Sequence, residues 1–310
     1  MRLNVGLLVA MLGMVGCDVP SAKTTLSGKA MGTTWTISLR GTRAAPSLQG
    51  EIEQTLDAWE QALSRWRDDS ALAAFNRSQS TEWQDVDARL AKAVATAKAV
   101  AEQTEGALDI TIAPLVKLWG FDAKGPPTDV PSMAQISEKL KQCGWDRVEV
   151  STGPPRLRKK IPGLTLNVDA VAEGLAVDEI AEWLVQGGQK VFLINLGGEV
   201  LAKGGPWQVG IQMPEAPQGQ AFTTVELHNE ALATSGIYRQ NFERAGHRYS
   251  HILDPRTGSP IQGDLASVSV IAPSCTQADA WATALLVLGR EKGDPIANRS
   301  GMRVVWIEGK

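Results

Sequence analysis

The sequence predicts an α+β fold, in which helices dominate the first part of the chain and strands the second. Apolar residues recur at helical spacing up to about residue 185, and short strand-like segments separated by Gly, Pro and polar turns follow. One more helix and one more strand end the chain. With 310 residues, 43% of them apolar, the chain can bury one large core or two modest ones. Segregation of helices and strands along a chain is typical of α+β domains.

The first expected elements are a strand and a set of helices. In residues 33–39 the apolar Trp35, Ile37 and Leu39 alternate with Thr and Ser, as in a half-buried strand. Gly106 follows an Ala-, Lys- and Glu-rich stretch and is expected to close it as a helix. The periodic segments between the strand and the middle of the chain predict helices, the third of them a short helix or turn, at 48–63, 87–103, 114–119 and 132–142.

The second part begins with another helix and then becomes a series of strands. Asp169 is a good N-cap for a helix over 170–185, which Gly187 and Gly188 end. Short segments bounded by turn residues predict strands at 191–194, 207–211, 223–227, 248–253 and 266–271. A last helix and a last strand are expected at 276–288 and 303–307.

Charge and cysteine content exclude several classes of function. The formal net charge of −3 and the pI near 5.8 argue against a nucleic-acid surface, where a basic stripe is expected. The only run of three basic residues, 158–160, is interpreted as a solvated loop edge. Three His, three Cys and no Cys-x-x-Cys pair leave little material for a zinc or iron–sulfur site. Cys143 and Cys275 are expected to be free, buried thiols.

The N-terminus has the pattern of a targeting segment. Met1 and Arg2 supply positive charge, and the apolar stretch 5–15 is too short to span a bilayer. The tetrapeptide 14–17 resembles a lipoprotein cleavage site, so residues 1–17 are predicted to be a signal peptide ending at Cys17. The alternative is an ordinary signal peptide in which Cys17 is incidental. Residues 18–25 are then expected to be a tether and 26–310 the folded domain.

Two segments near the C-terminus concentrate residues suited to chemistry. Residues 250–260 carry a His, two Ser, an Asp, an Arg and two Pro, and a second segment contains Asp279 and Thr283. In a helix this spacing of four puts both oxygens on one face, one turn apart. A carboxylate beside a hydroxyl suits a hard cation such as Mg²⁺. The alternatives are an ordinary turn for the first segment and a solvated helix face for the second.

These segments belong to a larger set of motifs that carries a family resemblance. From Leu26 to Ile307 the chain resembles the bacterial FAD:protein FMN transferases, the flavin-transferring periplasmic lipoproteins of the ApbE type. Besides the two segments above, the motifs that carry the resemblance are residues 30–35 (AMGTTW), 64–70 (SRWRDDS), 106–111 (GALDIT), 114–121 (PLVKLWGF), 172–178 (AEGLAVD), 195–199 (NLGGE) and 234–239 (TSGIYR).

The resemblance implies both a fold and a reaction. The expected architecture is ApbE-like and related to the T-fold, with a mixed, mainly antiparallel sheet and flanking helices. The implied reaction cleaves the pyrophosphate of FAD and joins FMN to a Ser or Thr hydroxyl of another protein, releasing AMP. Phosphoryl transfer of this kind requires a cation, donors around the phosphates and an activated nucleophile.

For the metal, the resemblance points to Mg²⁺ held by residues of two segments. Asp279 is the expected anionic ligand and Thr283 a neutral one. The main-chain carbonyl of Ala170 is the expected third ligand, and Ala282 falls in the same metal-binding turn. A relative with Asp at position 282 would have one more carboxylate, so weaker Mg²⁺ binding that depends on FAD is expected here.

For FAD, the resemblance carries contact positions onto eight residues. Trp66 stands where relatives often have Tyr, and its ring is expected to stack on the flavin or the adenine unless it belongs to the core. Asn167 stands where the family usually has Asp, with Asp169 as a candidate to compensate for the missing charge. The eight expected contacts are Met31, Trp66, Ala107, Leu108, Asp109, Asn167, Glu173 and Leu253.

His251 is the expected general base for the attacking hydroxyl, because imidazole titrates near working pH. The alternative is a hydrogen-bonded core histidine. Arg239 and Arg256 are candidates for phosphate contacts or for structural ion pairs.

Two other functions stay open at this point. One is a Mg²⁺-dependent FAD pyrophosphatase, in which water replaces the acceptor hydroxyl, and the other is a non-catalytic FAD-binding lipoprotein. No stretch of the chain resembles the family's acceptor segment, which has Asp-Gly followed by a Gly-Ala-Thr type sequence, so the acceptor is expected to be another protein. Subunits of membrane redox pumps and flavin-bearing periplasmic reductases are the expected acceptors. Lipidation of Cys17, with Asp18 after it, implies attachment to the periplasmic side of the inner membrane.

Overall fold

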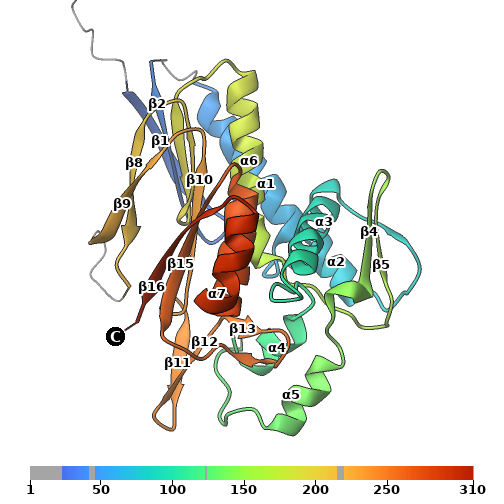
Figure 1. Ribbon diagram of the computed structural model, residues 1–310. Coiled ribbons are helices and arrows are strands. Elements are labelled where there is room, and N and C mark those ends of the chain that lie inside the picture. Colours follow the sequence, from blue (N-terminus) through green and yellow to red (C-terminus); the bar gives the residue numbers. More distant parts are fainter. Residues whose placement is uncertain (1–22, 42–45, 123, 215–219, 310) are drawn as a thin grey trace, which may run out of the picture.

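The computed structural model describes residues 23–41, 46–122, 124–214 and 220–309 (Figure 1). The expected signal peptide, including Cys17 and Asp18, lies outside the described residues. Within the described part of the chain, no helix is both long and apolar enough to cross a membrane.

A seven-stranded sheet forms the centre of the fold, and each neighbouring pair of its strands is antiparallel. This confirms the predicted α+β class with a mainly antiparallel sheet. In spatial order the strands are β1 (Lys23–Ala30), β2 (Thr33–Arg40), β6 (Phe192–Leu196), β7 (Glu199–Lys203), β10 (Ala231–Gly236), β15 (Leu265–Ala272) and β16 (Arg303–Glu308).

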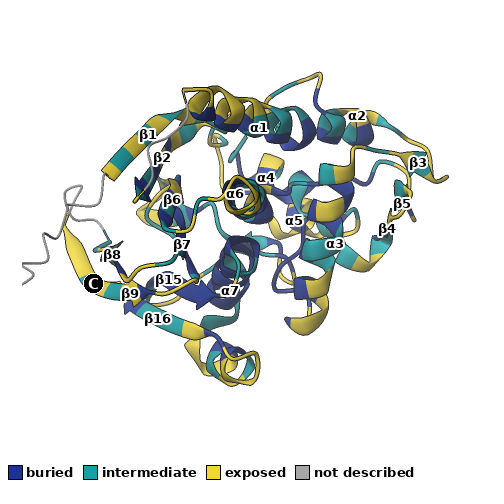
Figure 2. Cartoon of the chain, turned by 90° about the horizontal axis from the view of Figure 1, so that it is seen from above, coloured by how far each residue is buried: buried dark blue, intermediate teal, exposed yellow. Residues whose placement is uncertain are grey.

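One face of the sheet is covered by helices, and together they form the main core (Figures 1 and 2). The alternation in β2 buries Trp35, Ile37 and Leu39, as predicted, with exposed fractions of 2% or less. The helices that pack there are α1 (Leu48–Leu63), α3 (Ala88–Gln103), α6 (Asp169–Gln186) and α7 (Cys275–Arg299). The other face of the sheet contacts a hairpin of β8 (Trp207–Gln212) and β9 (Ala221–Leu227) through a second, smaller apolar cluster.

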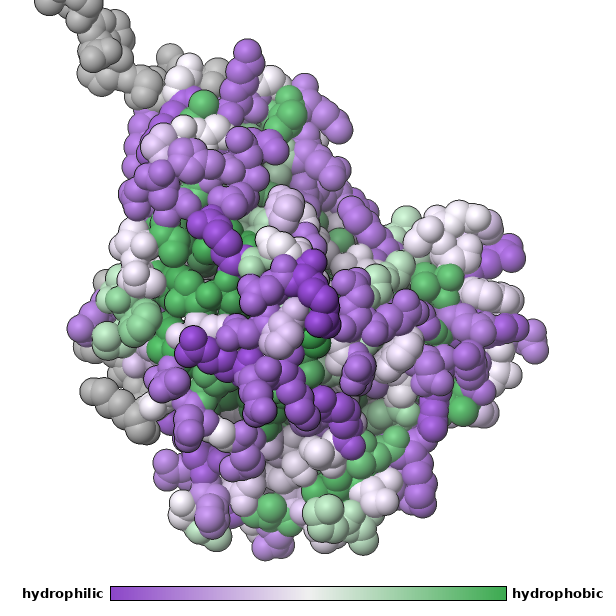
Figure 3. Space-filling view, viewed as in Figure 1, coloured by the Kyte–Doolittle hydropathy of each residue, from purple (hydrophilic) through white to green (hydrophobic). Residues whose placement is uncertain are grey.

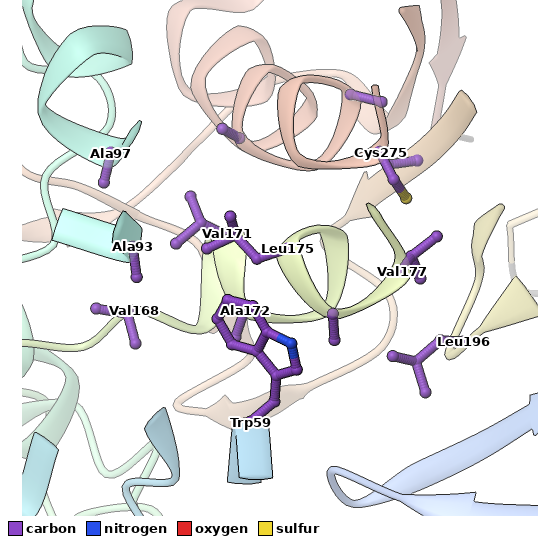
Figure 4. Close-up of a cluster of buried hydrophobic side chains, with 14 of the residues drawn as sticks. Trp59, Ala93, Ala97, Val168, Val171, Ala172, Leu175, Val177, Leu196 and Cys275 are labelled. Atoms are coloured by element: carbon purple, nitrogen blue, oxygen red, sulfur yellow. The ribbon is translucent and has the colours of Figure 1, made fainter. Parts of the chain in front are cut away.

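The contact between α6 and α7 fixes the centre of the molecule. A Cβ on Gly174 of α6 would lie 2.7 Å from the Cα of Thr276, so only glycine allows the two helices to approach this closely. The Asp178 carboxylate of α6 accepts from the main-chain N–H groups of Cys275 and Thr276, at 2.8 and 2.9 Å, at the start of α7. A carboxylate is favourable at this end of a helix. Figure 4 shows side chains of α6 between Trp59 of α1 and Cys275 of α7.

A smaller lobe lies beyond the helical layer and carries the segment around His251. Its apolar cluster includes Leu115, Trp119, Ile136 and Leu253. The indole N–H of Trp119 donates to the carbonyl of Gly258 at 2.8 Å, which anchors the turn after His251. The short elements of this lobe are α4 (Ala113–Leu118), α5 (Met133–Leu140), β11 (Asn241–Arg244), β12 (His247–Ser250), β13 (Leu253–Asp254) and β14 (Ser259–Pro260).

A three-stranded sheet packs beside α3 on the far side of the helices. It consists of β3 (Gln84–Asp85), β5 (Pro155–Lys159) and β4 (Val148–Thr152), next to α2 (Ala71–Arg77) and the 3₁₀ turn Trp145–Arg147. Lys159 of β5 is 0% exposed, so the prediction of a solvated loop edge for 158–160 is wrong there. Its ammonium donates to the carbonyl of Ser78 at 2.5 Å and lies 4.7 Å from the ring centre of Phe75. Strand pairing buries this lysine, which its charge had led us to expect on the solvent-exposed surface.

Four other expectations differ from the structure. The N-cap of α6 is Val168, and Asp169 is the first helical residue, because its carboxylate pairs with Arg65 instead of capping. The strand predicted over 248–253 divides into β12 and β13, with His251 in the break. The helix predicted to end at residue 288 does break at Gly289, whose φ/ψ is non-helical, but a second helical segment, which was not predicted, then continues to Arg299. β1 begins at Lys23, so the last three residues of the expected tether are part of the sheet.

The two described cysteines, Cys143 and Cys275, are free and buried, as predicted. Figure 3 shows hydrophilic side chains over most of one face of the molecule, with hydrophobic ones visible in several separate areas.

Candidate functional site

Three carboxylates from three elements are held in the protein interior at the α6–α7 contact. They are Glu173 of α6, Glu199 at the start of β7 and Asp279 of α7. Glu199 and Asp279 are 5% and 6% exposed. Asp279 Oδ2 accepts from the main-chain N–H of Gly174 at 3.2 Å, whereas Glu199 Oε2 is buried without a hydrogen-bond partner. A buried carboxylate oxygen without a donor is costly unless a cation or a proton joins it.

The raised pKa values of the three carboxylates reflect the same excess of negative charge. Burial, and then repulsion from Glu199, raises the pKa of Glu173 to about 8. Burial, and then repulsion from Asp279, raises the pKa of Glu199 to about 8. The pKa of Asp279 lies well above its ordinary value, chiefly because of burial and then because of Glu173. The site therefore favours binding of positive charge.

Thr283 adds a hydroxyl to this site, one helical turn after Asp279. Its Oγ1 lies 2.8 Å from Oγ of Ser235 on β10, so the sheet holds the threonine in place. Neither Asp279 nor Thr283 belongs to a solvated helix face. The Ala282 side chain is 0% exposed and offers no oxygen, and Ala170 lies in the first turn of α6.

The donor set fits Mg²⁺ better than a softer metal. It consists of carboxylate and hydroxyl oxygens, which Mg²⁺ prefers, and it contains no thiolate or imidazole. Among the residues that the structure describes, no three His, Cys, Asp or Glu side chains form a ready-made metal centre. A cation here would therefore also use hydroxyl, main-chain or substrate oxygens, as Mg²⁺ commonly does.

Arg239 is the cation that connects the carboxylates to the rest of the site. Its positive charge partly offsets the rise in the pKa values of Glu173, Glu199 and Asp279. The same charge lowers the pKa of His251. Its guanidinium donates to the carbonyl of Gly197 at 3.1 Å. A Cβ at Gly198, whose φ is +119°, would lie 2.8 Å from the guanidinium, so the glycine leaves room for it.

Arg256, the other candidate for a phosphate contact, forms a structural ion pair. Its Nε and one terminal nitrogen each lie 2.8 Å from an oxygen of Asp254, a two-point contact that raises the pKa of Arg256. The Arg256 guanidinium is therefore occupied by Asp254, in the turn that Trp119 anchors.

His251 lies at the edge of the smaller lobe, next to the same arginine. Its Nδ1 is 3.0 Å from the carbonyl of Gln240. When Nδ1 carries the proton and donates it to that carbonyl, Nε2 keeps its lone pair, which is the form a general base needs. Burial, opposed by the Gln240 hydrogen bond, lowers the pKa of His251, which favours the neutral imidazole.

A cavity of about 390 Å³ is lined by Gln240, the partner of His251, and by two arginines, Arg65 and Arg239. Its wall includes Arg65, Trp66, Phe121 and Arg239. Trp66 is 61% exposed, so it is not a core residue, and the Arg65 guanidinium lies 4.1 Å from the centre of its ring. Arg65 also pairs with Asp169 at 2.8 Å and donates to the carbonyl of Phe121 at 3.2 Å. These contacts join two segments of the cavity wall to the start of α6.

The other expected FAD positions are distributed around this centre. Met31 lies in the β1–β2 turn, where its N–H donates to Glu60 Oε2 at 3.2 Å. Ala107, Leu108 and Leu253 are buried. The Asp109 carboxylate is 6% exposed and accepts from the N–H and hydroxyl of Thr111 at 2.8 and 2.7 Å; burial raises its pKa.

Asn167 connects the 107–111 loop to the start of α6. Its main-chain N–H donates to Ile110 O at 2.7 Å, and its Oδ1 accepts from the N–H of Asp169 at 2.9 Å. Asp169, the candidate to compensate for the missing charge, has its carboxylate paired with Arg65. Whether Asp169 compensates for the missing charge at Asn167 stays a prediction, as does the alternative that FAD affinity is altered.

Sequence reasoning assigned no role to several residues that shape this site: Arg65, Asp178, Glu199, Ser235 and Gln240. Glu199 directly follows Gly197 and Gly198, and an acidic residue after two glycines at the start of a strand was the available signal. The others act through partners distant in sequence, which no local pattern shows.

Comparison with known proteins gives one consistent result. The family model described as "ApbE family" matches residues 31–306. The chain is 38% identical over 321 residues to "FAD:protein FMN transferase" of Escherichia coli (strain K12), covering 98% of this chain and 92% of the relative.

Two solved structures extend this likeness to the fold. "Flavin Transferase ApbE from Vibrio cholerae" has a TM-score of 0.84 and 35% identity, with 93% of this chain and 94% of that chain covered. The apo form of "Pseudomonas stutzeri flavinyl transferase ApbE" has a TM-score of 0.84 and 34% identity, with 94% and 92% covered.

Proposed function

The chain belongs to the ApbE family, and from this premise we propose that it is an FAD:protein FMN transferase that requires Mg²⁺ and modifies a Ser or Thr hydroxyl. The observation that supports this most strongly is the arrangement around Arg239. The charge of that guanidinium acts on three carboxylates, two of them buried and one half-buried, and on a histidine whose Nδ1 contacts a main-chain carbonyl. A candidate cation site and a candidate general base thus share one arginine that lines the cavity, an arrangement suited to phosphoryl transfer.

The metal would be held by the α6–α7 contact. Asp279 provides the anionic oxygen, Thr283 and the main-chain carbonyl of Ala170 provide neutral ones, and Ala282 lies in the same turn. Bound there, Mg²⁺ would supply positive charge to offset that of the FAD pyrophosphate. Arg239 would be a further donor to the phosphates, because a guanidinium suits anion binding.

FAD would occupy the space between α6, the 107–111 loop and the cavity beside Trp66. Trp66 presents an exposed ring on which a flat heterocycle can stack. Asp109, Asn167 and Glu173 offer polar atoms, and Met31, Ala107, Leu108 and Leu253 offer main-chain or apolar contacts.

His251 would act on the acceptor hydroxyl. The hydroxyl oxygen attacks the phosphorus of the FMN half of FAD while its proton passes to Nε2 of His251. The bond from this phosphorus to the bridging oxygen breaks, and AMP leaves. The Gln240 carbonyl holds the proton of Nδ1, so the imidazole accepts only at Nε2.

The acceptor is another protein, because this chain has no stretch like the family's acceptor segment. That protein would be of the redox-pump or periplasmic-reductase type. The protein is attached by a lipid on Cys17 to the periplasmic side of the inner membrane. A positive start, a short apolar stretch and Gly16 before Cys17 support this. Loss of membrane association in Cys17→Ser is the expected result, and unchanged association would contradict it.

Mass spectrometry of an acceptor segment tests the activity. Incubation of the protein with FAD, Mg²⁺ and a synthetic peptide carrying the Asp-Gly…Gly-Ala-Thr type sequence should add FMN to the peptide and release an equal amount of AMP. Excess EDTA should stop both. Release of FMN and AMP with the peptide unmodified would identify a pyrophosphatase, and FAD binding without either product would identify a flavin-binding protein.

A further inference from the structure

The hairpin that precedes His251 has a strand edge without a partner strand. Among the described strands, β11 pairs with β12 and with no other, so its second edge is open. The register sets Asn241 opposite Ser250 and Phe242 opposite Tyr249. Figure 1 shows this hairpin at the end of the molecule away from α1 and α6. An open edge is a template for another extended chain.

One hydrogen bond shows which main-chain N–H and C=O groups of β11 point away from β12. The N–H of His251 donates to the carbonyl of Gln240 at 3.0 Å, which makes these two residues a hydrogen-bonded pair. In an antiparallel ladder such pairs alternate with non-hydrogen-bonded pairs. Asn241, the next residue, therefore belongs to a non-hydrogen-bonded pair, and its main-chain N–H and C=O point away from β12.

Asn241, which carries these free groups, lines the cavity that Arg65 and Arg239 also line. Gln240, Asn241 and Phe242 line one side of it, and Gly120, Phe121 and Pro126 line another. No residue of β12 lines the cavity. The guanidinium of Arg244 donates to the carbonyl of Pro127 at 2.8 Å, which connects β11 to the 120–127 segment beyond the cavity. The cavity is thus bordered by a strand edge rather than by side chains alone.

From this arrangement we infer that the acceptor protein binds as an extended segment that adds to the free edge of β11. The inference rests on the proposed function. A Ser or Thr oxygen is only two bonds from its own main chain, so the main chain of the acceptor must pass close to His251 for the proton to reach Nε2. The β11 strand begins two residues after Arg239 and directly after Gln240, the partner of the imidazole, so its edge lies close to His251.

The hydrogen bonds to β11 then position the hydroxyl. A segment paired with Asn241 exchanges main-chain N–H···O=C bonds with it, and its side chains alternate between the two faces of the extended hairpin. Every second side chain points to the same face, so only one register delivers the hydroxyl to His251. Main-chain pairing supplies affinity that does not depend on the acceptor's side chains.

The first test removes one N–H from β11 with a matched control. Asn241→Pro lacks the main-chain donor, whereas Asn241→Ala keeps it; both lose the side-chain bond from Asn241 to the carbonyl of Tyr238. Relative to Asn241→Ala, Asn241→Pro should raise KM for the Asp-Gly…Gly-Ala-Thr peptide about tenfold, the effect of one or two hydrogen bonds. The kcat and the FAD dissociation constant should be retained.

Three results would overturn the inference. Equal KM values for the two variants would show that the main-chain donor is not used. A tenfold loss of FAD affinity in Asn241→Pro would show that the flavin occupies the edge. A fall in kcat alone would show that proline acts through Gln240 and His251. Absence of transfer by the unmodified protein would instead contradict the proposed function.

A second test leaves the protein unchanged and alters the peptide. Single backbone amides of the acceptor peptide are methylated one at a time around its Ser or Thr, which removes one donor per peptide. Pairing with a strand edge predicts losses at alternate positions. Equal losses at all positions, or none, would overturn the inference even if Asn241→Pro failed to fold.

Discussion

The α6–α7 contact and the β11–β12 hairpin lie beside the same arginine but differ in how they are held. The first is deep in the main core, with Gly174 against Thr276 and Asp178 against the start of α7. The second is a two-stranded hairpin that no other described strand joins, anchored through the ring contacts Trp119–Tyr249 and Phe121–Phe242.

The difference corresponds to two tasks. A site for a small cation needs fixed oxygens, because the charge must be bound at one place and several buried carboxylates repel one another there. A site for a protein segment needs access and free main-chain groups. The following predictions alter one region while the other serves as the control.

Asp279→Ala is expected to have the largest effect. Transfer should fall by about a thousandfold or more, because several kcal/mol of transition-state charge stabilisation is lost with the anionic ligand. Thermal stability should be retained or rise, since the variant removes a carboxylate whose pKa is raised by burial and then by repulsion from Glu173. Melting temperature and transfer rate measured on the same sample check this; a folded variant with the original rate would contradict the metal assignment.

His251→Ala affects the other region and should lower transfer by about 10²–10⁴-fold. FAD binding and Mg²⁺ binding should be unchanged, because the imidazole contacts the Gln240 carbonyl and not the carboxylates. FAD titration, metal titration and single-turnover transfer separate these effects. If FAD affinity and melting temperature fell together with the rate, the histidine would have a structural role.

Lys159→Met sharpens the comparison by changing a buried charge outside both regions. Burial lowers the pKa of Lys159 to about 8. Because its pKa is lower in the folded than in the unfolded state, its protonation opposes folding fully below about pH 8, and this penalty disappears as pH rises toward 10.5. At pH 7 the variant should be more stable by on the order of 2 kcal/mol, after allowance for the lost bond to Ser78 O.

Denaturant unfolding at pH 7 and above pH 10.5 checks this expectation, with transfer activity unchanged. An equal difference in stability at both pH values would mean that the ammonium is not the cause.

Asn167→Asp is expected to have the smallest effect. The Asp side chain keeps an acceptor for the N–H of Asp169 and restores the residue that the family generally has. FAD binding should tighten or stay the same, because hydrogen bonds to a charged acceptor are the stronger ones. Fluorescence titration measures it; clearly weaker binding would mean that the added charge is repelled by Asp169 and Glu173.

The sequence predicted those features that depend on local spacing. Asp279 and Thr283 lie on one face of a helix because they are four residues apart, and β2 alternates because Trp35, Ile37 and Leu39 are two apart. Arg65 and Lys159 were not assigned their roles, because each is defined by a partner far along the chain. Asp169 was expected to cap α6, but its carboxylate instead pairs with Arg65, which is distant in the sequence. Long-range pairing decides such cases, and one sequence does not show it.

The central claim is that the buried negative charge at the α6–α7 contact is a cation site for FAD chemistry. Calorimetric titration of Mg²⁺ into the FAD-loaded protein tests it most directly, with Asp279→Asn as the control of equal size. The account predicts one Mg²⁺ bound by the unmodified protein, with protons released from carboxylates of raised pKa, and much weaker binding by the variant. Equal Mg²⁺ affinity in the two proteins would contradict it.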